Sequence, residues 1–210
     1  MKSVWQETVN IPEFPRLKGD INTDVLIIGG GMAGILTAYF LHQKGVKYVL
    51  VEKDRICSGT TQNTTAKITF QHGLVYQKIL KTKGLEPAQK YLEINKRALK
   101  KYEELCKNAE CDYERKDNFV YSADNRLKLE NEMNALMKIG YNAEFCEDVS
   151  IPIKTVGAVK FPHQAQFNPL KFVAIIANGL NIYENTFVRE MTESSAITDC
   201  GKIHAKKIVA

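Results

Sequence analysis

The sequence lacks the long apolar segments that membrane insertion or secretion would need. No hydrophobic run approaches the length of a transmembrane helix, and the first ten residues, MKSVWQETVN, contain no apolar core of a signal peptide. No internal repeat and no low-complexity tract is present. Because 44% of the 210 residues are hydrophobic, the composition is that of a globular protein, and we expect a cytoplasmic location.

Cysteine is scarce, and its spacing suits neither cross-linking nor metal binding. The five cysteines are an odd number at scattered positions, which argues against a disulfide framework and for a reducing compartment. Cys106 and Cys111 stand five apart, but no second pair follows at the spacing of a metal site. We therefore predict that these two cysteines are structural and that the protein holds no metal.

A strong excess of one charge is also missing. The 29 basic and 24 acidic residues leave a formal net charge of +5, and the basic residues are spread along the chain. This pattern favours an ordinary solvated surface over a nucleic-acid-binding face.

What the sequence does contain is an α/β pattern that is interrupted in its middle. After an irregular lead-in at residues 1–20, the pattern predicts a strand at 25–28, a helix at 31–44 and a strand at 46–51, the βαβ unit of a parallel sheet. The middle segment predicts helices at 86–107 and 125–139 and strands at 119–122 and 156–161. The α/β pattern then returns with a helix at 170–177, capped by Asn168 and Pro169, and with short strands up to residue 210.

The stretch DVLIIGGGMAG places Gly29, Gly31 and Gly34 in the spacing G-x-G-x-x-G directly after the first strand, with Gly30 as an extra glycine. We expect Gly29 to permit the tight turn, Gly31 to let a pyrophosphate approach the backbone, and Gly34 to let the helix pack closely. Glu52 ends the next strand, eighteen residues beyond Gly34, where a carboxylate can accept hydrogen bonds from ribose hydroxyls. The strand, the helix and this carboxylate favour dinucleotide binding over a chance glycine-rich turn.

The polar loop at residues 57–69 bears on whether the dinucleotide is FAD or NAD. A plain NAD-binding domain usually continues from this point into another crossover helix. Here Gly59, Thr60 and Thr61 open a hydroxyl-rich loop that would line an extended cofactor with hydrogen bonds. A polar surface loop without a ligand is the alternative.

These residues resemble the FAD-dependent oxidoreductases of the glycine oxidase and D-amino acid oxidase superfamily. The resemblance lies in DVLIIGGGMAG and in VLVEKDRICSGTTQNTTAKITFQHG, and the second stretch is most similar to a bacterial subgroup that often carries a C-terminal Rieske domain. It implies a Rossmann-like FAD-binding domain, with a parallel sheet, formed by residues 21–80 and 160–210. A mostly helical α+β insertion on the substrate side, residues 81–159, would interrupt this domain.

The resemblance also implies a set of site residues. It assigns Gly29, Gly31, Met32, Ala33 and Gly34 to the pyrophosphate, Glu52 and Lys53 to the adenosine ribose, and Val188 in NTFVREM to the adenine. It assigns Thr60, Thr61, Thr65, Ala66 and Lys67 to the ribityl chain and the flavin, and Gly59 is a further cofactor-binding candidate from the polar loop. Gln71 and His72 lie just beyond, where they would face the flavin or the substrate, or would form only a satisfied turn.

The activity that the resemblance implies is oxidation of a C–N bond in an amine or amino acid. A hydride would pass from the α-carbon to the flavin N5, and the resulting imine would hydrolyse in water. Lys67 and His72 are the candidate catalytic residues: Lys67 would stabilise the reduced, anionic flavin, unless it is only a surface charge. The electron acceptor would be oxygen or a protein partner such as a Rieske domain.

The sequence departs from the superfamily in its length. Members are typically much longer, their closing strand commonly runs into A-T-G, and the cysteine–histidine pairs of a Rieske domain are missing here. We therefore expect this chain to be a fragment of a longer protein. Two alternatives remain at this point: a non-catalytic FAD-binding fragment and, with less support, an NAD-dependent dehydrogenase.

Overall fold

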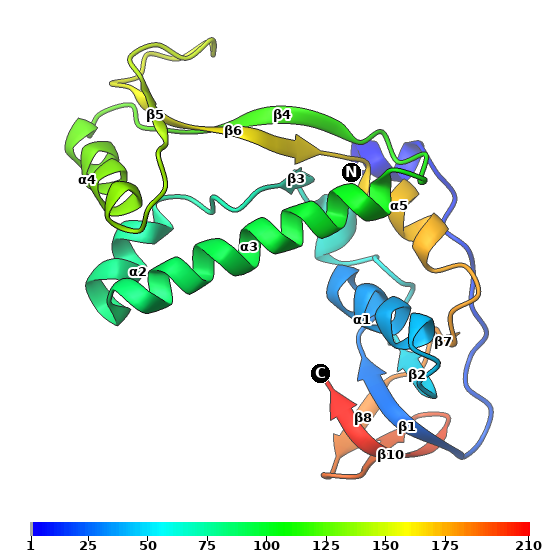
Figure 1. Cartoon of the computed structure of the whole chain (residues 1–210). Helices are drawn as coiled ribbons and strands as arrows, with labels where there is room; N and C mark the ends of the chain where they lie inside the picture. The colour runs from blue at the N-terminus through cyan, green and yellow to red at the C-terminus, as the bar shows by residue number, and fades with distance from the viewer. Residues whose placement is uncertain (1) are drawn as a thin grey trace. The chain divides into compact units, whose positions relative to one another are not determined.

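The structure, a computed structural model that describes residues 2–210, divides into two compact units (Figure 1). The first unit contains the residues up to Thr65 together with Asn168–Ala210, and the second is the continuous stretch Ala66–Phe167. The sequence analysis expected the FAD-binding domain to include residues 66–80 and 160–167. In the structure these residues belong to the second unit. The reason is strand pairing, because β3 (Lys67–Ile68) pairs with the end of β6 (Ala158–Gln166).

The first unit is built on a six-stranded sheet in the order β7-β2-β1-β10-β9-β8. Its strands are β1 (Ile21–Ile28), β2 (Tyr48–Val51), β7 (Ile182–Tyr183), β8 (Val188–Met191), β9 (Ser195–Thr198) and β10 (Gly201–Val209). β1 pairs in parallel with both β2 and β10, and β2 pairs in parallel with β7, while β8, β9 and β10 are antiparallel. This sheet confirms the predicted α/β class, and the parallel strands bring their carboxyl ends to one edge.

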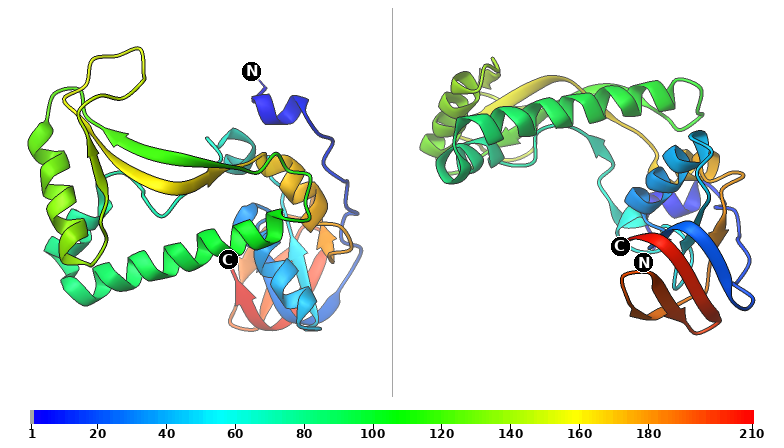
Figure 2. Two further views of the ribbon diagram at one scale, coloured as in Figure 1. Left: turned by 45° about the horizontal axis from the view of Figure 1, so that its top comes forward. Right: turned by 60° about the horizontal axis from the view of Figure 1, so that its bottom comes forward.

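Two helices of the first unit follow from local sequence signals. α1 (Met32–Gln43) connects β1 to β2 and lies against both strands (Figure 2), with Ile35 and Ala38 fully buried. α5 (Pro169–Ile176) begins as predicted, because the Asn168 side chain accepts hydrogen bonds from the first-turn N–H groups and Pro169 occupies the first helical position. Leu26 and Leu50 of the central strands are 0% exposed, as continuous apolar runs buried on both faces require.

The second unit packs three helices with an antiparallel sheet. Its strands are β3, β4 (Glu114–Tyr121), β5 (Glu144–Cys146) and β6, and its helices are α2 (Val75–Lys83), α3 (Leu85–Cys106) and α4 (Arg126–Lys138). β6 pairs with all three other strands, and a buried cluster that includes Tyr76, Leu129, Leu136 and Phe161 forms the core. Two short 3₁₀ helices, Val4–Glu7 and Thr60–Asn63, lie in the first unit.

Within residues 2–210, the structure contains no helix that combines the length and the apolar character needed to cross a membrane.

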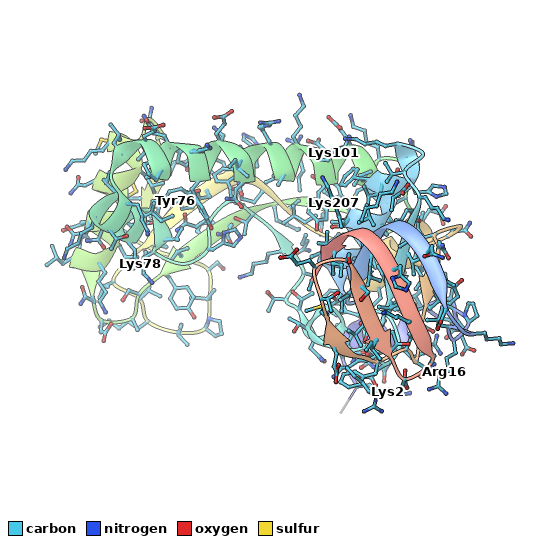
Figure 3. All side chains as sticks on the ribbon, turned by 90° about the horizontal axis from the view of Figure 1, so that it is seen from below. Lys2, Arg16, Tyr76, Lys78, Lys101 and Lys207 are labelled. Carbon is cyan, nitrogen blue, oxygen red and sulfur yellow. The ribbon has the colours of Figure 1, made fainter. Side chains whose placement is uncertain are left out.

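A buried carboxylate joins α4 to the start of α2. Glu132 on α4 is 0% exposed, and its two oxygens accept hydrogen bonds from the N–H groups of Tyr76 (labelled in Figure 3) and Gln77, at 3.0 and 2.8 Å. The first N–H groups of a helix have no partner within the helix, and a negative charge there is favourable. α2 follows Leu74, whose side chain cannot cap a helix, so Glu132 supplies the cap from another element.

We expect Glu132→Ala to lower the free energy of unfolding by about 2–3 kcal/mol, because two N–H groups at the start of α2 lose their acceptor. Glu130→Ala is the matched control on the same helix: Glu130 is exposed and makes a surface ion pair with Arg126, so its loss should cost less than about 1 kcal/mol. Urea denaturation followed by circular dichroism measures both changes. Equal losses in the two variants would contradict the capping role.

Candidate functional site

The glycine-rich turn lies at the carboxyl end of β1, where the parallel strands of the first unit end. Gly29 has a φ of +106°, a conformation that L side chains rarely adopt, and its N–H donates to the carbonyl of Val51 at 2.8 Å. A Cβ on Gly34 would lie 1.9 Å from the carbonyl oxygen of Gly29. The turn and the close packing expected of Gly29 and Gly34 are therefore present in the structure.

Residue 30 must also be a glycine for a steric reason, which the sequence did not reveal. A Cβ at this position would lie 2.8 Å from Cγ2 of Ile56 and 3.0 Å from Cβ of Glu52. Both neighbours come from the segment after β2, so the local motif carries no signal of this contact. Gly30 lets that segment pack directly on the turn.

Gly31 differs from its neighbours, because nothing in the chain requires a glycine there. Its φ of −75° and ψ of −178° suit any residue, and a Cβ would meet only the Thr61 hydroxyl oxygen at 3.7 Å, an ordinary van der Waals distance. Gly31 is the residue before the first turn of α1. The lack of a side chain therefore leaves the backbone at the helix start open to a molecule from outside the chain.

The N-terminus of α1 presents backbone donors beside this open position. The N–H of Ile35 donates to the carbonyl of Gly31 at 3.0 Å, and the N–H groups of Met32, Ala33 and Gly34 precede that bond in the chain. The N–H of Met32 lies 3.1 Å from the Thr61 hydroxyl oxygen, to which it donates. First-turn N–H groups and the helix dipole together favour an anion at this end.

Glu52 is fixed at the end of β2 by two backbone donors. One carboxylate oxygen accepts from the N–H of Gly30 at 2.6 Å, and the other accepts from the N–H of Asp54 at 3.0 Å. An ionised carboxylate offers about four acceptor positions. The remaining positions can accept hydrogen bonds from hydroxyl groups of a ligand beside the turn.

A cavity of about 190 Å³ lies beside Gly29 and Glu52. It is lined by Ile28, Gly29, Val51, Glu52, Lys53, Thr186, Phe187 and Val188. This volume is below the roughly 300 Å³ at which pockets for drug-sized ligands begin, so it suits one ring system. Four predicted residues meet here, namely Gly29, Glu52, Lys53 and Val188.

Sequence reasoning missed Phe187 and Thr186 among the residues that line this cavity. Phe187 is 46% exposed, and the N–H of Thr186 donates to the carbonyl of Glu52 at 2.9 Å, which ties this segment to the end of β2. The sequence shows an aromatic residue directly before Val188, but its exposure beside the cavity follows only from tertiary contacts.

The polar loop packs back on the glycine turn. The N–H of Cys57 donates to the carbonyl of Gly30 at 2.9 Å, and the Trp5 indole N–H donates to the carbonyl of Thr64 at 2.8 Å. Burial raises the pKa of the Cys57 thiol to about 12, so this cysteine stays protonated and unreactive near neutral pH. Gly59, Thr60 and Thr65 are exposed on the same loop.

The other predicted residues belong to the second unit. Lys67 is exposed on β3, and Ala66 precedes it with a φ of +57°. His72 is exposed, and its Nδ1 lies 2.9 Å from the Tyr91 hydroxyl. Gln71 is buried, and its amide N–H₂ donates to the carbonyl of Gly73 and, at 3.4 Å, to Glu132.

The glycine turn, the donors of α1 and the carboxylate that ends β2 define a dinucleotide-binding α/β protein. A family described as FAD dependent oxidoreductase (DAO) matches residues 24–210. The Bacillus subtilis (strain 168) protein YhfW, named as a Rieske 2Fe-2S iron-sulfur protein, is 34% identical over 194 residues, which are 88% of this chain and 38% of that protein. The chain belongs to the DAO family of FAD-dependent oxidoreductases, and FAD is the cofactor of this family.

Solved structures share the fold of this chain. L-proline dehydrogenase from P. horikoshii superposes with a TM-score of 0.68 at 17% identity and covers 93% of this chain and 52% of its own. L-amino acid deaminase from Proteus vulgaris gives 0.67 at 18% identity, covering 96% and 49%. Glycine oxidase from Bacillus cereus ATCC 14579 gives 0.62 at 21% identity, covering 89% and 54%. The chain therefore spans about half the length of these structures and 38% of YhfW.

We expect Gly34→Ala to lower the free energy of unfolding by at least about 2 kcal/mol, because the added Cβ would overlap the Gly29 carbonyl oxygen and push α1 away from the turn. Gly31→Ala in the FAD-free protein is the matched control: its φ of −75° and ψ of −178° suit any residue, and a Cβ there meets only the Thr61 hydroxyl oxygen at 3.7 Å. Its effect should stay within about 0.5 kcal/mol. Chemical denaturation measures both, and a stable Gly34→Ala variant would refute the close-packing role.

Proposed function

We propose that this chain binds FAD through its first unit and is part of an enzyme that oxidises a C–N bond in an amine or amino acid. The observation that carries the binding proposal is Gly31. Its missing side chain serves no contact within the protein, yet it exposes the backbone at the start of α1. A ligand with a pyrophosphate group that approaches this backbone explains why residue 31 is a glycine.

Different residues of the first unit would bind the pyrophosphate and the adenosine ribose of FAD. The N–H groups of Ala33 and Gly34 would hold the pyrophosphate, and Thr61 would support it by accepting from Met32. Glu52 would hold the adenosine ribose through its remaining acceptor positions. Gly59, Thr60 and Thr65, which are exposed on the polar loop, would hold the ribityl chain.

The cavity beside Glu52 would receive the adenine. Three residues that line this cavity would hold the ring: the Phe187 side chain, the backbone of Val188 and the stem of Lys53. The volume of about 190 Å³ supports this assignment, because it suits a single ring system of the size of adenine.

FAD, when bound, supplies the chemistry by accepting a hydride at N5 from the carbon next to the substrate nitrogen. The names of the three solved structures, a proline dehydrogenase, an amino acid deaminase and a glycine oxidase, support an amine or amino acid as the substrate class. We assign Lys67 the role of placing a positive charge where negative charge develops during the reaction. His72, whose ring is held by Tyr91, would contact the substrate.

We propose a protein-bound 2Fe-2S centre as the electron acceptor, on the strength of the Rieske name of YhfW. Oxygen is the other acceptor that the chemistry allows. Hydrogen peroxide formation during turnover in air would identify oxygen, and its absence together with reduction of an iron–sulfur centre would identify the partner.

Heat or acid denaturation of the purified protein should release FAD, visible as a flavin absorbance spectrum. Glu52→Ala should weaken FAD binding about tenfold to hundredfold, because charge-assisted hydrogen bonds to the ribose are lost. Asp54→Ala is the control, since its side chain is 65% exposed and pairs only loosely with Lys53 at 3.7 Å. Fluorescence titration of the apoprotein with FAD measures the affinities, and equal affinities in the two variants would remove Glu52 from the site.

Anaerobic mixing of the full-length enzyme with amino acids or amines should bleach the flavin in a single turnover. Lys67→Met should slow this reduction about tenfold, because a charge worth roughly 1.4 kcal/mol in the transition state is removed. Lys83→Met, at the exposed end of α2, is the control and should react at the unchanged rate. A normal rate in Lys67→Met would exclude the lysine, and no bleaching by any amine would exclude C–N oxidation.

A further inference from the structure

A buried carboxylate that the proposed site does not use directly follows β7 in the first unit. Glu184 is 1% exposed and comes after Tyr183, the residue at which β7 ends beside β2 (Figure 1). β2 and β7 are parallel, so Glu184 lies at the same edge of the sheet as Glu52. A carboxylate is costly to bury unless polar and charged groups compensate it, and the partners of Glu184 therefore show what it holds in place.

The Glu184 side chain contacts two segments that are distant from it in sequence. One carboxylate oxygen accepts a hydrogen bond from the N–H of Ile56 at 2.8 Å. The other oxygen accepts from the N–H of Phe14 at 3.1 Å and lies 2.9 Å from Nε of Arg55, with which it forms an ion pair. Glu184 therefore fixes the segment after β2 and, through Phe14, the residues that lead into β1.

The segment that Glu184 holds reaches the glycine turn through Ile56. Cγ2 of Ile56 lies 2.8 Å from the position that a Cβ on Gly30 would take, and the next N–H along the chain, that of Cys57, donates to the carbonyl of Gly30. Glu52, at the start of the same segment, accepts from the N–H of Gly30. A shift of Ile56 would therefore move the turn and the carboxylate that ends β2 together.

The residues that follow Glu184 form another part of the cavity assigned to adenine. The Thr186 hydroxyl donates to the carbonyl of Glu184 at 2.9 Å, and the N–H of Thr186 donates to the carbonyl of Glu52, also at 2.9 Å. Thr186, Phe187 and Val188 line the cavity together with Glu52, whereas Glu184 is not among the lining residues. Glu184 thus lies behind the cavity, between the two segments that enclose it.

We propose that Glu184 is a positioning residue for FAD, which acts through Ile56 and Thr186 and does not contact the cofactor. The inference rests on the proposed function, because it takes FAD as the ligand of this site. The carboxylate joins the segment that starts at Glu52 to the segment that runs to Val188, so the cavity has its shape before the ligand arrives. A preorganised site avoids the cost of ordering these segments on binding, and this raises the affinity.

Positioning of the cofactor and stabilisation of the fold lead to different results when Glu184 is changed. If Glu184 only stabilised the fold, its substitution would lower the free energy of unfolding and leave the affinity of the folded protein for FAD unchanged. Positioning predicts a loss of affinity that persists when the measurement is confined to folded protein. The affinity of the folded state is therefore the quantity that separates the two roles.

Titration of the full-length apoprotein with FAD, followed by fluorescence, tests the proposal, and competition with ADP tests the adenosine half alone. In Glu184→Gln one carboxylate oxygen becomes an amide N–H₂ group, which cannot accept from Ile56 or Phe14 and does not pair with Arg55. We expect the Kd for both ligands to rise about tenfold to hundredfold, because the cavity is no longer preorganised. Circular dichroism at the temperature of the titration verifies that the variant is folded.

Glu13→Gln is the matched control, because Glu13 pairs with the same guanidinium group. Its carboxylate lies 2.7 Å from Nη1 of Arg55, but its side chain is 82% exposed. The Kd for FAD should therefore change by less than about twofold. Equal losses in Glu13→Gln and Glu184→Gln would overturn the inference, since the loss would then follow from the Arg55 pairing and not from the buried contacts.

The titration also separates a failure of this inference from a failure of the proposed function. If the unsubstituted protein binds FAD and Glu184→Gln binds it equally well, the positioning role is wrong and FAD binding stands. If the unsubstituted protein binds neither FAD nor ADP, the proposed function itself is wrong, and the inference is wrong with it.

Hydrogen exchange in the unsubstituted apoprotein gives a decisive answer if Glu184→Gln does not fold. The N–H groups of Ile56, Cys57 and Thr186 should exchange slowly both without and with FAD, because their acceptors belong to the protein. Rapid exchange of these groups without FAD, followed by protection once FAD is added, would overturn the inference, because the ligand would then shape the cavity.

Discussion

The first unit depends on the close approach of α1 to the backbone of the turn before it. With no Cβ on Gly34, the first turn of α1 sits directly against the carbonyl of Gly29, and this contact sets where the helix starts and which way it runs. Ile35 and Ala38 are then buried without remaining exposure. The same contact aims the free N–H groups of the helix at the edge where the parallel strands end, so the packing of the unit and the electrostatics of its site have one origin.

The segment after β2 completes what the turn begins. Glu52 and Cys57 bind the N–H and the carbonyl of Gly30, and Ile56 packs where a side chain on Gly30 would otherwise be. A turn with so little side-chain mass would leave its polar backbone groups exposed or mobile, and these contacts hold it in one conformation. The site is therefore preorganised by two segments that are far apart in sequence but belong to adjacent strands of the sheet.

Much of the first unit could be predicted from sequence because its signals are local. The apolar runs of β1 and β2, the glycine spacing and the Asn168–Pro169 helix start each lie within a few residues of the element they define. α2 was missed because its cap is Glu132, more than fifty residues away, and β3 was missed because two residues form a strand only through pairing with β6. Of the candidate site, the motif residues could be read, whereas Phe187 and the role of Gly30 depend on contacts that no local pattern records.

The strand order has a consequence for how the protein is made. β1 lies between β2 and β10, so a strand near the start of the chain is paired, from Ile21↔Ile203 to Ile27↔Val209, with one that leaves the ribosome almost two hundred residues later. The second unit is a single uninterrupted stretch and can fold while translation continues. Until β10 emerges, one edge of β1 has no neighbour within the sheet, and the nascent chain must keep that edge from pairing with other chains. Chaperone dependence during synthesis should therefore centre on β1.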